Sequence, residues 1–471
     1  MTGVRNRVTR VTTKTCAVAL AGVLAGGLGA SIRTAAAGNA DTLPNLLAFD
    51  NASGQGRTFN TRGILDPNNP FFQSLGTNDR ACVTCHRAEE GWTMTPAGLQ
   101  RRFADSGGTD PVFRSNDGSN CAGADLTDPS TRQAAFSLLL SRGLIRIGLD
   151  VPPGAEFVIE SVDDPYQCNA GLISASMYRR PLPATNLTFL SAVMWDGRES
   201  PAGRSLTDSL LSQALDATLG HAQASLTPTP AELHQIVDFE TGLYTAQSSD
   251  RVAGGLGTRG ATGGPVALSH QPFFIGINDP LGQNPTGAAF DEIAFTLFDP
   301  WSTASSSASD GATVERAAIV RGQKLFNSRA FNITDVGGLN DDLHKASIGG
   351  TCTTCHDTPN VGNHSVKAPL DLGLTNVERR TPDMPLYTLR NLSTGDTRQT
   401  TDPGRAMITG KWRDVGRFKG PVLRGLAGRA PYFHNGFAAT LADVVTFYNT
   451  RFSIGLSAAE QSDLVAFLSA L

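Results

Sequence analysis

Two pairs of cysteines, each followed directly by a histidine, are the residues of this chain whose spacing most clearly indicates chemistry. The first is CVTCH at 82–86, and the second is CTTCH at 352–356, 270 positions later. A CxxCH unit could be part of a zinc site, a redox-active dithiol or an attachment point for c-type haem. A zinc site built from two CxxC pairs needs no histidine after each pair. A thioredoxin-like dithiol is expected near a βαβ pattern, which the sequence lacks.

The spacing within each unit favours haem. Cysteines at positions i and i+3 of a helical turn face the same side, so both thiols can bond to the vinyl groups along one porphyrin edge. The histidine that follows supplies an imidazole nitrogen to the iron. We therefore expect two covalently bound c-type haems, attached through Cys82, Cys85, Cys352 and Cys355, with His86 and His356 as iron ligands.

The supply of second ligands distinguishes an enzyme from an electron carrier. A carrier keeps both irons six-coordinate, whereas an enzyme leaves one iron face open for peroxide or oxygen. No histidine occurs between Arg87 and Met194, and the thioethers between these two residues are Met94 and Met177. The sequence favours an open first haem, with a methionine ligand and a non-catalytic dihaem carrier as the alternatives.

The first forty residues resemble a secretory signal peptide. An apolar run from Cys16 to Ala30 follows four basic residues and precedes the small residues Ala35–Ala37, a pattern typical of export. We expect residues 1–40 to be removed and the mature protein to reside in a bacterial periplasm. No later run is long enough for stable membrane insertion. Removal of residues 1–40 moves the formal net charge from −4 to −9, which argues against nucleic acid as a partner.

The remaining sequence predicts modest helices joined by long irregular loops. Glycine and proline total 76 residues, and alternating strand patterns are few. Capping residues and apolar spacing predict helices over Leu233–Tyr244, over Val314–Phe326 and from Ser457 onward. We predict a mainly α fold with an N-terminal haem domain at 41–301, a serine-rich linker at 302–313 and a C-terminal haem domain at 314–471. In an oxidising compartment the two remaining cysteines, Cys121 and Cys168, are expected to form a disulfide.

Two further segments carry a resemblance to a known family. VMWDGRES at 193–200 and FKGPVLRGLAGRAPYFHNGFAATLADVV at 418–445 resemble the WDGR and PYFH motifs of the bacterial dihaem cytochrome c peroxidase and MauG-type superfamily, in family order with both CxxCH units. The resemblance implies two cytochrome c-like haem domains. It also implies peroxide chemistry at the first haem, electron transfer at the second and a bridging role for Trp195.

The resemblance also implies further site residues. A tyrosine or methionine fourteen residues after the PYFH histidine binds the second iron, and this position is Tyr448. Met384 and Met407 are rival ligands. Gln213 matches the family's distal glutamine, but the distal glutamate that should follow it is replaced by Gln223. We therefore expect His221, or else Asp216, to carry the acid–base role.

The implied function is the reduction of hydrogen peroxide in the periplasm, with electrons from a small redox protein such as a cytochrome c or cupredoxin. The alternative is a MauG-like enzyme that oxidises a protein or organic substrate through a high-valent dihaem state. Family members also hold calcium between the haems. The backbone carbonyls of Arg429 and Pro431 could supply two of the calcium ligands. However, Arg180 stands where the asparagine ligand is expected, and arginine cannot bind calcium.

Overall fold

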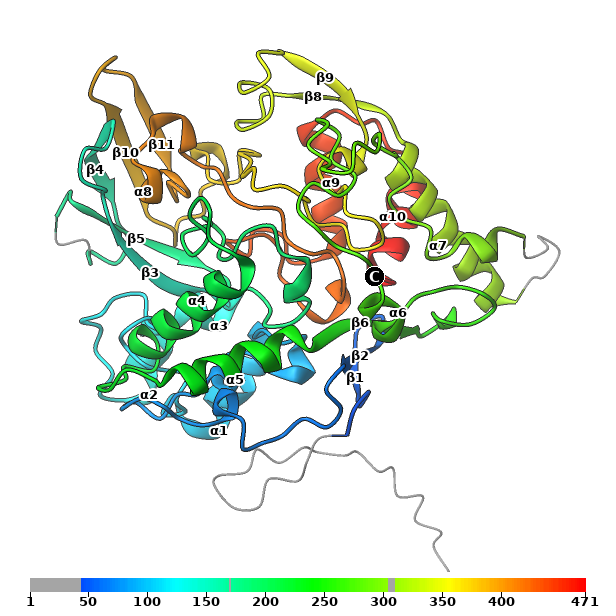
Figure 1. The fold of residues 1–471 in the computed structure, drawn as a ribbon. Helices are drawn as coiled ribbons and strands as arrows, with labels where there is room; N and C mark the ends of the chain where they lie inside the picture. Colours follow the sequence, from blue (N-terminus) through cyan, green and yellow to red (C-terminus); the bar gives the residue numbers. More distant parts are fainter. Residues whose placement is uncertain (1–43, 169–170, 304–309) are drawn as a thin grey trace, which may run out of the picture. The chain divides into compact units, whose positions relative to one another are not determined.

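Residues 44–168, 171–303 and 310–471 are described by the computed structural model (Figure 1). The predicted signal peptide and the centre of the predicted linker lie outside these residues. From Thr42 onward the chain forms one unit by its internal contacts. Its helices are α1 (Pro96–Ser106), α2 (Pro129–Ala135), α3 (Ser137–Arg142), α4 (Leu206–Gly220), α5 (Pro230–Thr241), α6 (Pro265–Ser269), α7 (Gly311–Ser328), α8 (Ala406–Thr409), α9 (Leu441–Arg451) and α10 (Ala458–Ser469).

The capping signals locate the helix starts. In α5, Thr229 and Glu232 form a reciprocal capping box, and Ser457 caps α10 in the same way. The helix α7 contains the predicted Val314–Phe326 segment. The end predicted for α5 is wrong, because the chain turns at Gly242 and enters a strand. Within the described ranges, none of the helices is both long and apolar enough to cross a membrane.

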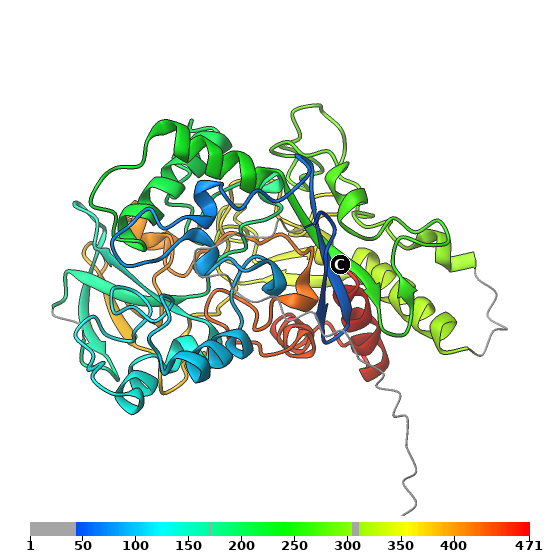
Figure 2. The same cartoon turned by 90° about the horizontal axis from the view of Figure 1, so that it is seen from below.

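Strands form several small antiparallel sheets. They are β1 (Ala48–Asn51), β2 (Gly54–Asn60), β3 (Ile145–Asp150), β4 (Phe157–Asp163), β5 (Ser174–Arg179), β6 (Leu243–Asp250), β7 (Gly254–Gly255), β8 (Phe331–Thr334), β9 (Ser347–Gly350), β10 (Leu386–Asn391) and β11 (Thr397–Thr400). The sheet orders are β1-β2-β6-β7, β11-β10-β4, β3-β5 and β8-β9. Figure 2 shows the blue β1 and β2 beside the green β6.

The prediction of a mainly α chain is therefore only partly right, since helix accounts for 31% and strand for 17%. The strands are short, and several are rich in glycine or polar residues, as in GQGRTFN of β2 and SIGG of β9. Such strands lack the alternating apolar pattern on which sequence-based detection depends.

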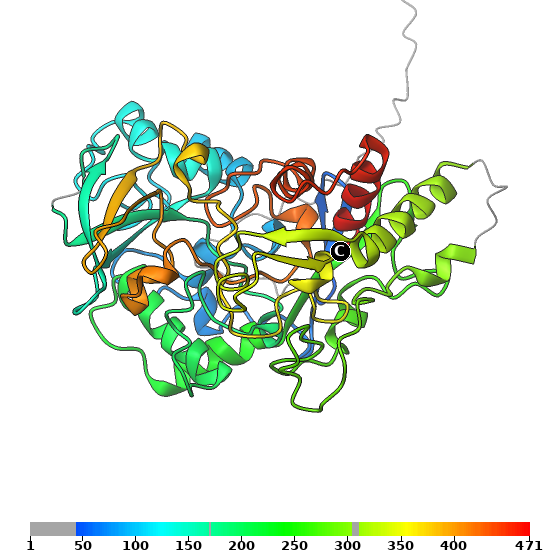
Figure 3. The ribbon, with the colours of Figure 1, turned by 90° about the horizontal axis from the view of Figure 1, so that it is seen from above.

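Residues on the two sides of the predicted linker pack together. The strand β4 pairs with β10 over Phe157–Asp163. The buried Arg179 at the end of β5 bonds to Asp196, at 2.5 Å, and to Asp402, at 2.7 Å. Figure 3 shows α7 and the red α10 side by side, and one buried cluster joins both helices to residues 253–301. The division into two haem domains stays a prediction.

Candidate active site

The two CxxCH units adopt the same local structure. Each begins with a single 3₁₀ turn, Cys82–Thr84 or Cys352–Thr354. The backbone N–H of the motif histidine donates to the carbonyl of the first cysteine, at 3.0 Å in the first unit and 3.1 Å in the second. In both units the threonine before the second cysteine accepts a hydrogen bond from the backbone N–H three residues earlier, at 3.0 Å. The same sequence pattern thus produces the same turn twice.

Both motif histidines are oriented for metal binding. Nδ1 of His86 lies 3.0 Å from the carbonyl oxygen of Trp92, and Nδ1 of His356 lies 2.7 Å from that of Gly362. A carbonyl only accepts, so Nδ1 carries the hydrogen and Nε2 is left free, as in metal-binding histidines generally. Burial lowers the pKa of both imidazoles, that of His86 to about 4. The neutral form, which binds iron, therefore dominates at neutral pH.

The motif thiols are available for covalent attachment. All four are free of disulfides, and burial raises the pKa of each, that of Cys352 and of Cys355 to about 12. Among the described residues, no three His, Cys, Asp or Glu side chains converge on a site that could hold a metal ion by themselves. The two CxxC pairs therefore do not form a shared zinc site, and the residues present fit c-type haem.

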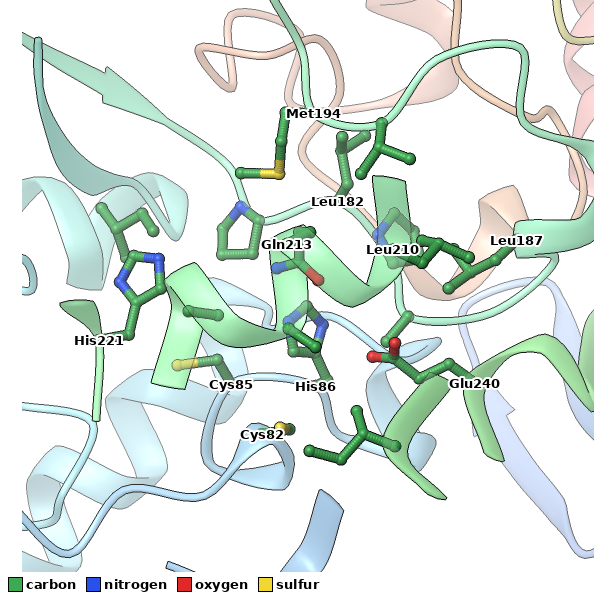
Figure 4. Close-up of a pocket in the computed structure, with 18 of the residues that line it drawn as sticks. Cys82, Cys85, His86, Leu182, Leu187, Met194, Leu210, Gln213, His221 and Glu240 are labelled. Atoms are coloured by element: carbon green, nitrogen blue, oxygen red, sulfur yellow. The ribbon is translucent and has the colours of Figure 1, made fainter. Parts of the chain in front are cut away.

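A cavity opens directly above the first motif. Its empty space, the open mouth included, is about 1570 Å³. Its walls are largely apolar, with Leu182, Leu187 and Leu210 among the lining side chains (Figure 4). A wide, apolar space beside two free thiols and a free imidazole nitrogen matches a flat porphyrin.

The helix α4 places Gln213 and His221 in this cavity. His221 is the C-cap residue of α4 and follows Gln213 by eight residues, about two helical turns. Both side chains therefore lie on the same side of the helix. Leu210, Ala214 and Ala217, on the same face, also line the cavity. Figure 4 shows Gln213 beside His86, with His221 and Glu240 on opposite sides of it. The structure thus brings together the predicted distal residues and the first motif, while their roles stay predictions.

Asp117 holds His221 in place, a contact that sequence reasoning missed. Its Oδ2 accepts a hydrogen bond from Nδ1 of His221, and its Oδ1 lies 2.5 Å from Nη1 of Arg80. Burial by itself would raise the pKa of Asp117, but the bond from His221 and the charge of Arg80 outweigh burial and lower it. The carboxylate is therefore ionised, and it leaves Nε2 of His221 free to take up a proton.

The predicted disulfide between Cys121 and Cys168 is confirmed, with the two Cα atoms 5.5 Å apart. Cys121 lies four residues after Asp117, and Cys168 lies in the segment between β4 and β5. The bond therefore ties the loop that carries Asp117 to a sheet region. No spacing signal in the sequence relates Asp117 to His221, because the two are 104 residues apart.

Trp195 is fixed at two points. Its indole Nε1 donates to the carbonyl of Arg180 at 2.8 Å, and its own carbonyl accepts from the backbone N–H of Lys419 at 2.9 Å. The ring lines the first cavity and meets the ring of His434 edge-on, at 6.1 Å between centroids. Trp195 thus contacts both the first cavity and the PYFH segment, and its bridging role stays a prediction.

The surroundings of the second motif are aromatic. Tyr448, on α9, packs in one apolar cluster with Cys355 and Phe452, and its ring lies 6.2 Å from that of Phe433. The rival ligands Met384 and Met407 belong to other clusters. Burial raises the pKa of the Tyr448 phenol, so only a cation at its oxygen would hold the phenolate. These contacts favour Tyr448 over either methionine as the ligand.

Arg180 occupies the region considered for calcium. Its Nη2 donates to the carbonyl oxygens of Arg429, at 3.2 Å, and Met94, at 3.0 Å. One of the two carbonyls proposed as calcium ligands is thus already bonded to a guanidinium. The contact argues against calcium at this position.

Sequence reasoning also missed several cavity residues. Met194 reaches the cavity (Figure 4), whereas Met94 and Met177 pack in separate buried clusters. Lys419 and Glu240 line the cavity as well. Their sequence contexts carry no sign of this: Glu240 reads as an ordinary helix residue, and Lys419 as part of the PYFH segment.

Comparison with known proteins finds relatives that are named cytochrome-c peroxidases. A scan against protein families finds no match. The chain is 37% identical over 144 residues to "Cytochrome-c peroxidase IdrP2" of Pseudomonas sp. (strain SCT), which covers 27% of this chain and 37% of that protein. The corresponding protein of Denitromonas iodatirespirans is 34% identical over 137 residues, or 26% and 36% of the two chains. The chain thus matches just over a third of the length of these relatives.

A solved structure titled "Crystal structure of a MauG-like protein associated with microbial copper homeostasis" aligns over 86% of both chains, with 15% identity and a TM-score of 0.40. This likeness is too weak to carry an argument. Over about a quarter of its length the chain is thus similar to proteins named cytochrome-c peroxidases. This similarity agrees with the resemblance of its CxxCH, WDGR and PYFH motifs to those of the bacterial dihaem cytochrome c peroxidase and MauG-type superfamily.

Proposed function

We propose that this protein is a periplasmic oxidoreductase with two c-type haems that reduces hydrogen peroxide at the first of them. The observation that carries the proposal is the single cavity in which the first CxxCH motif meets Gln213, His221 and Trp195. The matched cytochrome-c peroxidases support the same activity. The predicted export segment and the Cys121–Cys168 disulfide support the periplasm.

Each turnover breaks the O–O bond of one hydrogen peroxide molecule and consumes two electrons and two protons, which gives two water molecules. Cys82, Cys85 and His86 would hold the first haem, which would supply the redox chemistry of the reaction. His221 removes a proton from one peroxide oxygen at Nε2 and returns it to the other. The amide of Gln213 both donates and accepts, so it can orient the peroxide.

A small donor protein, a cytochrome c or a cupredoxin, would supply the electrons, and Cys352, Cys355 and His356 would hold the haem that receives them. Trp195 is suited to pass the electrons on to the first site, because its indole N–H and its backbone carbonyl both form hydrogen bonds. A fixed ring between the two sites keeps the donor and acceptor groups in a constant geometry.

Absorption and electron paramagnetic resonance spectra of the ferric, haem-loaded protein test the proposal. We expect one haem to change on addition of hydrogen peroxide and the treated protein to oxidise reduced cytochrome c. Two low-spin haems that peroxide leaves unchanged would instead identify an electron carrier. The variant Met194→Leu completes the test, because an unaltered first-haem spectrum shows that this thioether is not an iron ligand.

A MauG-like oxidation of a protein or organic substrate is the second candidate. The contact of Tyr448 with the second motif favours it, because a phenolate ligand stabilises ferric and higher oxidation states. This candidate predicts that peroxide-treated protein oxidises an added electron-rich phenol or indole faster than it oxidises reduced cytochrome c.

A further inference from the structure

Two buried basic side chains line the first cavity without a carboxylate partner among the described residues, and burial lowers the pKa of one of them, Lys419, to about 7. The side chains of Arg180 and Lys419 belong to residues that are only 5% and 6% exposed, and both line the cavity. In the parts of the chain that the structure describes, neither forms an ion pair. Other cations of the same wall are paired: Arg80 with Asp117, and Arg179 and Arg198 with Asp196.

Their hydrogen bonds go to backbone carbonyls instead. Nζ of Lys419 donates to the carbonyl of Ala192 at 2.7 Å, which among the described residues leaves two of its three donors without a partner. Arg180 donates to the carbonyl of Arg142 at 2.6 Å, besides those of Met94 and Arg429. A neutral carbonyl replaces only part of the hydration that a buried cation loses, so such a charge is costly unless an anion joins it.

Among the described residues of this wall, the ionised Asp117 is already paired with Arg80 and His221. The guanidinium of Arg429 also lines the cavity, and its positive charge adds to burial in lowering the pKa of Arg180 to about 10. Burial raises the pKa of Glu240 to about 8, so this carboxyl group is mostly neutral at pH 7. The cavity therefore combines apolar walls with a cationic end that lacks an anion.

We propose that Arg180 and Lys419 bind the two carboxylates of the porphyrin that the first motif attaches. The inference rests on the proposed function, since it requires a haem at Cys82 and Cys85. A porphyrin matches both features of the cavity, because its ring is flat and apolar and its two carboxylates lie on one edge. A carboxylate of an organic substrate is the other source of the same chemistry.

The position of the two cations also orients the ring. The carbonyl of Arg180 accepts from the indole of Trp195, and the backbone N–H of Lys419 donates to the carbonyl of Trp195. Both cations thus sit on segments bonded to this tryptophan. Groups that hold the porphyrin carboxylates would therefore be fixed to the residue proposed to bridge the two haems.

The variants Lys419→Met and Arg180→Met in the haem-loaded protein test this inference through the midpoint potential of each haem. Loss of a nearby positive charge favours the ferric state, so we expect the potential of the first haem to fall and that of the second to stay constant. Lys419→Arg and Arg180→Lys, which keep the charge, should restore the potential. Lys411→Met is the matched control, because Lys411 is exposed and paired with Glu156.

Three outcomes decide whether Arg180 and Lys419 bind the porphyrin carboxylates. An unchanged first-haem potential in Lys419→Met, with both haems attached, overturns the inference even when Arg180→Met does not fold. A wild-type protein whose mass shows no haem at Cys82 and Cys85 contradicts the proposed function instead. Acetate added to the wild-type protein distinguishes the two carboxylate sources: a shift of the first-haem spectrum that Lys419→Met abolishes would mean that the cations bind a free carboxylate and not the porphyrin.

Discussion

The two CxxCH motifs share one local structure but lie in contrasting surroundings. Each has the same 3₁₀ turn, the same threonine contact and a histidine whose Nδ1 meets a backbone carbonyl. Around the first motif the chain leaves a largely apolar cavity lined by His221, Gln213 and the basic side chains of Arg180 and Lys419. Around the second it packs Tyr448 and other aromatic rings.

This contrast shows which part of the sequence carries which property. Five residues are enough to define the attachment turn, because its hydrogen bonds lie within or next to the motif. The role proposed for each site depends on groups that are distant in sequence, such as His221 for the first and Tyr448 for the second. Changes at those distant groups should therefore affect one site and spare the other.

The largest effect is expected from Tyr448→Phe. Removal of the phenol deprives the second iron of its proposed ligand, so the absorption spectrum and potential of the second haem should change completely while the first haem is unaffected. Met407→Leu and Met384→Leu serve as controls. If either of these methionine variants changes the second-haem spectrum and Tyr448→Phe does not, the tyrosine is not the ligand.

His221→Ala should impair only the first site. Loss of a positioned acid–base group typically costs about 10²- to 10⁴-fold in rate, and steady-state oxidation of reduced cytochrome c by peroxide measures it. His234→Ala is the matched control, since this exposed histidine on α5 lies outside the cavity lining. Equal rates in the two variants would remove His221 from the proposed reaction.

Asp117→Asn should produce a smaller loss of the same kind. The amide can no longer fix the tautomer of His221, and loss of such an orienting partner typically costs about 10- to 100-fold. In the His221→Ala background the second change should add little, because the two groups act as one unit. Asp79→Asn, at an exposed ion pair with Arg114, controls for a general effect on this region. Additive losses in the double variant would contradict the coupling.

Replacement of Cys121 and Cys168 by serine should lower the unfolding stability of the region around the first site. A disulfide that closes a loop of this kind typically contributes ~2–4 kcal/mol, and here the loop spans 47 residues. Denaturant unfolding followed at the first haem should show the loss. The spectrum of the folded second haem should be unchanged, and an equal perturbation of both haems would indicate that the disulfide does not act locally.

Glu240 should make the stability depend on pH. Burial raises its pKa to about 8 from its ordinary value of 4.5, so its stabilising contribution is complete below pH 4.5 and is lost as the pH rises through 8. Between these values stability should fall by up to ~1.4 kcal/mol per pH unit. Glu240→Gln should flatten this dependence in thermal unfolding, whereas Glu160→Gln, on the exposed part of β4, should leave it unchanged.

Sequence reasoning located what is encoded locally. The haem motifs, the capped starts of α5 and α10 and the Cys121–Cys168 pair all depend on residue types at short spacing or on compartment chemistry. The sheets were not predicted, because paired strands such as β4 and β10 are over two hundred residues apart and neither carries a signal for the other. Helix content was overestimated for the same reason.

In the candidate site, too, contacts between distant segments could not be predicted from the sequence. Gln213 and His221 could be placed together, because eight residues on one helix share a face. Asp117, Arg180 and Lys419 could not, since each reaches the cavity from a different segment and their partners are backbone carbonyls or distant side chains. Charge pairing across such distances leaves no pattern in a single sequence.

The β4–β10 pairing has a consequence for the order of events during synthesis and export. A chain delivered from its N-terminus presents the first CxxCH motif long before residues 386–402 emerge. Until then β4 has no partner strand and Arg179 lacks Asp402. The first motif is therefore present while this side of the fold is unfinished, and Arg179, which lines the cavity, gains its partner Asp402 only after the second motif has been made.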